Sequence, residues 1–140
     1  MKLLQGYSPA RIIGALNRRR ADVFRKLQYR PQDTKQLSQA VLFESFHGES
    51  VSDSPLDIFH QLKTTHPELT FYWTIRRGKT QAPEGSIGVV WGSRQWLKVL
   101  ATAKYLVNNN SFPWYFRKVA GQVYLQTWHG TPLKRLGRDI

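Results

Sequence analysis

The apolar residues between Ser8 and Pro31 recur with the spacing of an amphipathic helix. They gather on one helical face and are Ile12, Ile13, Leu16, Val23, Phe24 and Leu27. Ser8 is a suitable N-cap, Pro9 suits the first helical position, and Pro31 cannot continue the helix. The pattern therefore predicts one helix in this segment, with an apolar stripe along one side.

The rest of the chain alternates short apolar runs with segments of helical spacing. We predict strands at 39–45, 69–75, 87–91, 105–107 and 122–128, and a polar loop at 76–86. We predict helices at 54–66, with Ser54 as cap and Pro55 first, at 93–103 after Ser93, at 112–120, and from 131 onward. Because strands that alternate with helices favour right-handed crossovers, the predicted class is α/β with a mostly parallel sheet.

Polar and charged residues stand where the predicted strands end. In open α/β sheets, ligands bind beyond the carboxyl ends of the strands, so these positions are candidates for a functional site. They are Glu44, Ser45, His47, Arg76, Arg77, Asn108, Asn109, Asn110, Ser111, His129 and Thr131.

The segment that begins at His129 has the features of a phosphate-transfer site. Gly130 permits a tight turn, and Thr131 can cap a helix whose free amide groups face outward. Such a helix start beside Lys134 and Arg135 suits a bound phosphate. An imidazole next to that phosphate can act as a general base toward an attacking hydroxyl. A histidine bonded only to the backbone is the alternative, and the position at a strand tip favours the catalytic interpretation.

Composition narrows the class of protein. A chain of 140 residues with 41% hydrophobic residues can bury a core, and the lack of cysteine excludes disulfide scaffolds, thiolate metal sites and cysteine nucleophiles. The formal net charge of +12 indicates an anionic partner. Residues 1–40 hold nine basic and two acidic residues, a net +7, so this segment differs from the remainder.

The predicted N-terminal helix combines its apolar stripe with basic residues on the other flank. These candidates for contact with an anionic membrane surface are Arg11, Arg18, Arg19, Arg25 and Lys26. A helix whose stripe packs on its own domain has the same pattern, so both interpretations stay open. The start of the chain lacks the apolar run of a secretory signal, which favours a cytoplasmic location.

Three ordered segments resemble a known family. They are VLFESFHGESVSDSPLDIFHQL at 41–62, KYLVNNNSFPWYF at 104–116 and YLQTWHGTPLKRLGRDI at 124–140. Together they resemble the CDP-glycerol glycerophosphotransferase family, the teichoic acid primases and polymerases. The resemblance covers roughly residues 40–140.

The resemblance implies a reaction, a fold and a set of residues. Members move glycerol phosphate from CDP-glycerol to a hydroxyl of a lipid-linked acceptor at the cytoplasmic membrane face, and CMP leaves. The implied architecture is GT-B-like, with Rossmann-like halves and no cofactor or tightly held metal. His129 would be the catalytic base. The residues that match the motifs are expected to line the cleft: Glu44, Ser45, Asp53, Asn108, Asn109 and Ser111.

The chain departs from the family pattern at two points. His47 stands where the first motif usually has no histidine, so it inherits no role. The chain ends at Ile140, and the carboxyl-terminal half that would bind most of CDP-glycerol is not in it. We therefore expect a basic helical segment at 1–38, a Rossmann-like N-terminal half at 39–140, and no activity of this chain alone.

Two other functions stay open from the sequence. A basic, aromatic surface can bind nucleic acid, although no recognition-helix or RNP-type pattern is present, and the basic helix could act as a membrane-surface module without catalysis. Glu44, His47 and Asp53 could gather a divalent ion, but we favour a solvated loop and expect no metal site. Whether the acceptor is primed or extended, and whether the donor carries glycerol or ribitol phosphate, stays undecided.

Overall fold

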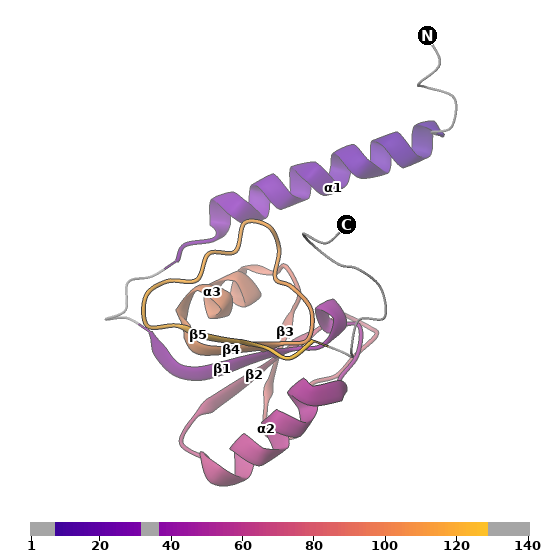
Figure 1. Ribbon diagram of the computed structural model, residues 1–140. Helices are drawn as coiled ribbons and strands as arrows, with labels where there is room; N and C mark the ends of the chain where they lie inside the picture. The colour runs from indigo at the N-terminus through magenta and orange to yellow at the C-terminus, as the bar shows by residue number, and fades with distance from the viewer. Residues whose placement is uncertain (1–7, 32–36, 129–140) are drawn as a thin grey trace, which may run out of the picture.

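A five-stranded sheet forms the centre of the protein (Figure 1). The computed structural model describes residues 8–31 and 37–128. The strands are β1 (Ser38–Glu44), β2 (Thr70–Ile75), β3 (Ile87–Val90), β4 (Ala103–Asn108) and β5 (Val123–Gln126), in the order β3-β2-β1-β4-β5. Every neighbouring pair is parallel, which confirms the predicted α/β class with a parallel sheet.

Three α-helices accompany the sheet. They are α1 (Pro9–Gln28), α2 (Asp53–Thr65) and α3 (Arg94–Thr102), and a short 3-10 turn, η2, spans Phe46–Gly48. α2 lies on one face of the sheet and α3 on the other, while α1 extends away from the sheet on the α3 side (Figure 1). The predicted loop at 76–86 contains no helix or strand.

The central strand β1 is buried because both of its faces are covered. Its residues from Ala40 to Glu44 are fully enclosed, as the apolar run predicts for a strand inside a parallel sheet. Leu42 joins a core cluster with Trp96 of α3. Phe43 points to the opposite face, where its ring stacks on Trp73 with 5.3 Å between the ring centroids.

Local hydrogen bonds explain where α3 begins, and one predicted cap is wrong. The Ser93 hydroxyl accepts a bond from the amide of Trp96 at 3.1 Å, as the sequence predicts. The indole of Trp96 in turn donates to the Thr74 hydroxyl at 2.9 Å, which ties α3 to β2. α2 begins earlier than predicted, because Ser52 rather than Ser54 is its cap residue.

The predicted helix at 112–120 is also wrong, because the structure shows an irregular connection there. Pro113 interrupts the backbone pattern, and the buried rings of Phe112 and Tyr115 join the core from an irregular segment with a turn at Trp114 and Tyr115. The buried side chain of Gln122 replaces helical hydrogen bonds. It accepts from the Val119 amide at 3.1 Å and donates to the carbonyl of Ala103 at 2.9 Å.

α1 leaves its apolar stripe exposed. None of its residues is buried, and the exposed large apolar side chains are Ile12, Ile13, Leu16, Val23, Phe24 and Leu27. The packing of this stripe on its own domain therefore does not occur among the described residues. Tyr29, just after α1, is buried in the core and joins the helix to the domain. None of the described helices is long and apolar enough to cross a bilayer.

Phe59 is the residue of α2 whose truncation should cost the most stability. Its ring is fully buried and packs edge-on against Phe43 and Trp73. We expect Phe59→Ala to lower the free energy of unfolding by about 3–5 kcal/mol in urea denaturation, because it leaves a cavity. Ile13→Ala on the exposed stripe should change it by no more than about 0.5 kcal/mol. Equal losses in the two variants would contradict this description of the core.

Candidate functional site

The register between β1 and β4 brings two distant motifs into contact. Glu44 and Asn108 are partners in the ladder, so their side chains lie side by side at the carboxyl end of the sheet. Both are fully buried, and the Asn108 amide nitrogen donates to Glu44 Oε1 at 3.3 Å. The site predicted at the strand ends is therefore built around this pair.

The neighbouring residues form a second set of polar contacts. Asn109 donates from Nδ2 to the Asp53 carboxylate at 2.8 Å, and its Oδ1 accepts from the Phe46 amide at 2.9 Å. The Ser45 hydroxyl donates to the Ser52 carbonyl at 2.7 Å. Because Ser45 and Asn109 are buried and bonded within the protein, they shape the loop after β1 rather than face solvent.

The loop after β1 has an unusual backbone. Phe46, His47 and Gly48 have φ values of 46°, 56° and 80°, and Asp53 has a φ of 64°. A side chain at Gly48 would come within 3.1 Å of Thr74 and 3.2 Å of the Ile75 backbone, so only glycine fits. Left-handed residues other than glycine store strain, and such strain is concentrated at functional sites.

His47 covers the Glu44 carboxyl group. Its Nδ1 lies 3.6 Å from Glu44 Oε1, while its side chain keeps 40% exposure. Glu44 Oε2 is buried and has no hydrogen-bond partner among the described residues. A buried carboxylate oxygen without a donor costs about 1–3 kcal/mol, so the arrangement is unfavourable for stability by itself. Sequence reasoning gave His47 no role, because its position over Glu44 depends on the left-handed turn.

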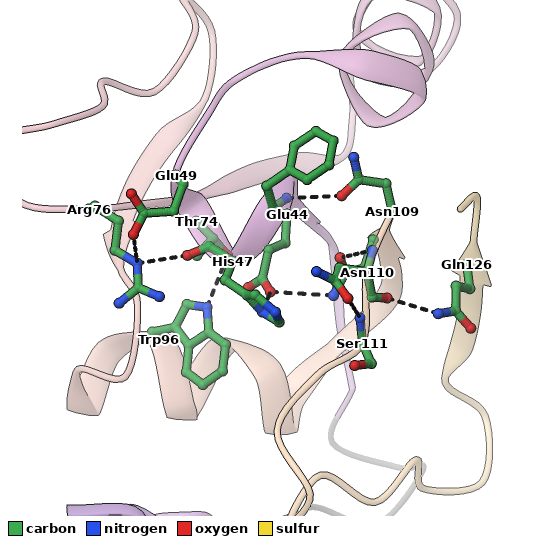
Figure 2. A network of polar contacts seen from close by, with 12 residues as sticks. Glu44, His47, Glu49, Thr74, Arg76, Trp96, Asn109, Asn110, Ser111 and Gln126 are labelled. Atoms are coloured by element: carbon green, nitrogen blue, oxygen red, sulfur yellow. Dashed lines mark hydrogen bonds and ion pairs between the residues drawn. The ribbon is translucent and has the colours of Figure 1, made fainter. Parts of the chain in front are cut away.

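Arg76, at the carboxyl end of β2, holds this loop in place. Its Nε donates to the His47 carbonyl at 2.8 Å and lies 3.4 Å from Glu49 Oε1 (Figure 2). Its guanidinium also lies 4.3 Å from the ring centroid of Trp91. The hydroxyl of Thr80 donates to the Gly48 carbonyl at 2.8 Å. Arg76 therefore binds the backbone of the loop. Its position after β2 marked it as a candidate for ligand binding, but the sequence could not predict this structural contact.

β5 closes the site on the other side. Tyr124 and Gln126 both donate to the Asn110 carbonyl, at 3.3 Å and 3.0 Å. Burial raises the pKa of Tyr124 above its usual value, and the nearby Glu44 carboxylate adds to the increase. Ser111 is exposed at the rim, where its amide donates to Asn110 Oδ1 at 2.9 Å. These contacts fix the polar segment that follows β4.

The residues expected to carry the chemistry lie outside the described residues: His129, Gly130, Thr131, Lys134 and Arg135. The described chain reaches Trp128, and the Thr127 amide donates to the Asn108 carbonyl at 2.9 Å. Thr127, near the end of the described chain, therefore lies at the same edge of the sheet as Glu44.

Glu44, His47 and Asp53 do not form a metal centre. No group of three or more metal-ligating side chains occurs in the part of the chain that the structure describes. Glu44 contacts Asn108 and His47, whereas Asp53 contacts Asn109.

The basic residues of α1 divide into two groups. Arg25 pairs with Asp22 at 3.1 Å and lies 5.0 Å from the Trp91 ring centroid, and Lys26 lies 5.1 Å from that of Trp114. These two side chains contact the protein itself. The other candidates, Arg11, Arg18 and Arg19, are exposed.

Most of the chain matches the model of a known protein family. Residues 26–140 match the model of the CDP-glycerol:poly(glycerophosphate) glycerophosphotransferases. The chain belongs to this family. It is 39% identical over 105 residues to the teichoic acid poly(glycerol phosphate) polymerase of Bacillus subtilis (strain 168), covering 73% of this chain and 14% of that protein. It is 35% identical over 102 residues to the teichoic acid glycerol-phosphate transferase of Staphylococcus aureus (strain NCTC 8325 / PS 47), covering 71% of this chain and 26% of that one.

Solved structures of the wall teichoic acid polymerase TagF share the fold. The chain matches one with a TM-score of 0.77 and 31% identity, over 94% of its own length and 33% of that chain. A TagF variant soaked with CDPG matches with a TM-score of 0.76 and 27% identity, over 96% and 35% of the two chains. The parallel sheet thus corresponds to part of the GT-B-like TagF. The chain spans about a third of the length of these structures.

A substitution of Asn109 tests the hydrogen bonds that join the segment after β4 to the loop after β1 and to the start of α2. Asn109→Asp removes the donor to Asp53 and sets two carboxylates against each other, so we expect a loss of about 1–3 kcal/mol in the free energy of unfolding at neutral pH. Asn17→Asp on exposed α1 adds the same charge and should change it by less than about 0.5 kcal/mol. The loss should shrink in acid, where protonation removes the repulsion. An unchanged midpoint in urea at neutral pH would contradict the network.

Proposed function

We propose that this chain is the acceptor-binding half of a transferase that moves glycerol phosphate from CDP-glycerol to a hydroxyl of a lipid-linked acceptor in teichoic acid synthesis. The observation that carries this proposal is the buried Glu44–Asn108 pair at the carboxyl edge of the sheet, in a chain that belongs to the glycerophosphotransferase family. The edge holds side chains that can bind hydroxyl groups, as a polyol acceptor requires.

His129 is proposed as the general base. It follows Thr127 by two residues, and the backbone bond from Thr127 to Asn108 supports its location at the same edge. The imidazole would take the proton of the acceptor hydroxyl, whose oxygen attacks the β-phosphorus of CDP-glycerol. A new P–O bond forms to the acceptor, and the bond to CMP breaks. Lys134 and Arg135 would offset the negative charge on the phosphoryl oxygens.

The described residues are proposed to orient the acceptor. Because the Glu44 side chain is fully buried, it would not contact the acceptor directly. Instead it would hold His47, whose exposed ring can exchange hydrogen bonds with a hydroxyl of the acceptor. Asp53 and Ser111 stand at the exposed rim and would contact the acceptor, whereas Ser45 and Asn109 set the shape of the loop.

The donor would be bound mostly outside this chain. The chain spans a minor part of its relatives, and a TagF structure was soaked with CDPG, which supports CDP-glycerol as the donor. Residues 39–140 would form the Rossmann-like N-terminal half, preceded by a helical segment at 1–38. We expect no CMP release from CDP-glycerol by the 140-residue chain alone.

A membrane surface is the proposed location of the reaction. α1 offers an exposed apolar stripe and the exposed cations Arg11, Arg18 and Arg19, a combination that suits the interface of an anionic bilayer. The chain would then lie peripherally on the inner face of the cell membrane, where a lipid-linked acceptor is within reach.

A chimera tests the proposed reaction. Residues 26–140 would replace the matching segment of the Bacillus subtilis polymerase, and CMP release would be measured with CDP-glycerol and a lipid-linked glycerol phosphate acceptor. We expect transfer by the chimera and a loss of at least ~100-fold in His129→Ala, because the proton acceptor is gone. His66→Ala on the exposed end of α2 should keep full activity.

Three results would contradict parts of the proposal. A folded chimera that binds CDP-glycerol but transfers nothing would exclude the function. Full activity of a folded His129→Ala chimera would exclude His129 as the base. CMP release by the isolated chain would show that the carboxyl-terminal half is not needed.

A further inference from the structure

A groove runs between α1 and α3, and none of the residues that line it belongs to the polar contacts around Glu44 and Asn108. One cavity of about 440 Å³ is lined by Leu27, Arg30, Arg94, Lys98 and Thr102, among others. A second cavity, of about 540 Å³, shares Arg94 with it and continues along α1 to Phe24. The two therefore form one groove along the carboxyl-terminal half of α1, which we call the α1–α3 groove.

The α1–α3 groove concentrates positive charge. Arg30, Arg94 and Lys98 line it, and none of them has an ion-pair partner in residues 8–31 and 37–128. Arg94 and Lys98 lie one turn apart on α3 and so face the same side. No acidic residue lines either cavity. Three neighbouring cations repel each other, and a bound phosphate group would relieve that repulsion.

The walls of the groove are apolar and open to solvent. Phe24 is 63% exposed and Leu27 is 64% exposed, and both continue the apolar stripe of α1. Cations beside exposed aliphatic and aromatic side chains suit a molecule with an anionic head and a hydrocarbon tail. A nucleic acid strand would instead need flat aromatic platforms for its bases. Among the residues that line the two cavities, Phe24 is the one aromatic ring, and it lies in the cavity that lacks Arg30 and Lys98, so the groove offers no row of platforms.

We propose that the α1–α3 groove binds the phosphate headgroup of an anionic membrane phospholipid. Arg30, Arg94 and Lys98 would contact the phosphate, while Phe24 and Leu27 enter the acyl boundary beside it. This inference rests on the membrane location within the proposed function. It adds a specific binding site for one lipid headgroup to the general attraction between the basic helix and an anionic bilayer. The site would fix the rotation of the domain on the bilayer as well as its attachment.

Vesicle co-sedimentation of the full chain tests the groove. The vesicles are phosphatidylcholine with or without phosphatidylglycerol, at ~0.15 M salt. The groove variant carries Arg30→Gln, Arg94→Gln and Lys98→Gln. A matched control carries Arg11→Gln, Arg18→Gln and Arg19→Gln, which removes the same charge from exposed positions of α1. Circular dichroism and thermal unfolding confirm that both variants fold.

We expect the groove variant to bind phosphatidylglycerol vesicles at least ~10-fold more weakly than the control variant, because it loses a site as well as charge. Equal losses, or a larger loss in the control, would show attraction spread over the whole surface and would overturn the groove. Absence of vesicle binding by the unmodified chain would overturn the membrane location and the groove together, while the chimera assay still tests transfer.

Amide shifts of the chain identify the source of the phosphate. Dihexanoyl phosphatidylglycerol should produce saturable shifts at Leu27, Arg94 and Lys98, which the groove variant lacks. Equal affinity for inorganic phosphate would overturn a lipid site and indicate a free anion. Tighter binding of a single-stranded oligonucleotide in the same groove, with a steep dependence on salt, would overturn it in favour of nucleic acid.

Discussion

The parallel pairing of β1 with β4 is the constraint on which the rest of the site depends. It sets Glu44 beside Asn108 across a sequence separation of 64 residues. A shift of one residue in this register would turn Asn108 to the other face of the sheet and leave the Glu44 carboxyl without its donor. Asn109 would move with it, away from Asp53 and the Phe46 amide. The register is held by apolar side chains on both faces of β1, so the core determines the polar geometry.

The same core connects the site to the N-terminal helix. Arg25 of α1 and Arg76, which follows β2, both lie against the ring of Trp91, and Arg76 donates to the His47 carbonyl. Tyr29 anchors the end of α1 in the core cluster under α3. α1 is therefore attached at its carboxyl-terminal end, while its stripe stays exposed. A protein with this arrangement can present an apolar helix face to a surface without unfolding its domain.

The spacing of apolar and polar residues predicted most of the helices and strands. The two wrong predictions have physical causes. The strands and α3 follow from apolar runs and a Ser cap, because burial in a parallel sheet and helix capping both leave short-range signals. The helix expected at 112–120 is absent because its aromatic side chains are buried from an irregular segment that Gln122 holds. The predicted start of α2 differs because Ser52, not Ser54, is the cap position, and its side chain makes no cap hydrogen bond.

The sequence by itself determined the fold class, because that class depends on the order of apolar runs and helical segments along the chain. It also predicted a site at the carboxyl edge of the sheet from the polar residues there, among them Glu44, Asn108 and Asn109. Only the tertiary structure decided which of them touch. It placed His47 over Glu44 through a left-handed turn, assigned Arg76 to the loop backbone, and left the α1 stripe uncovered. These features depend on strand register and on packing between distant segments, which no local pattern records.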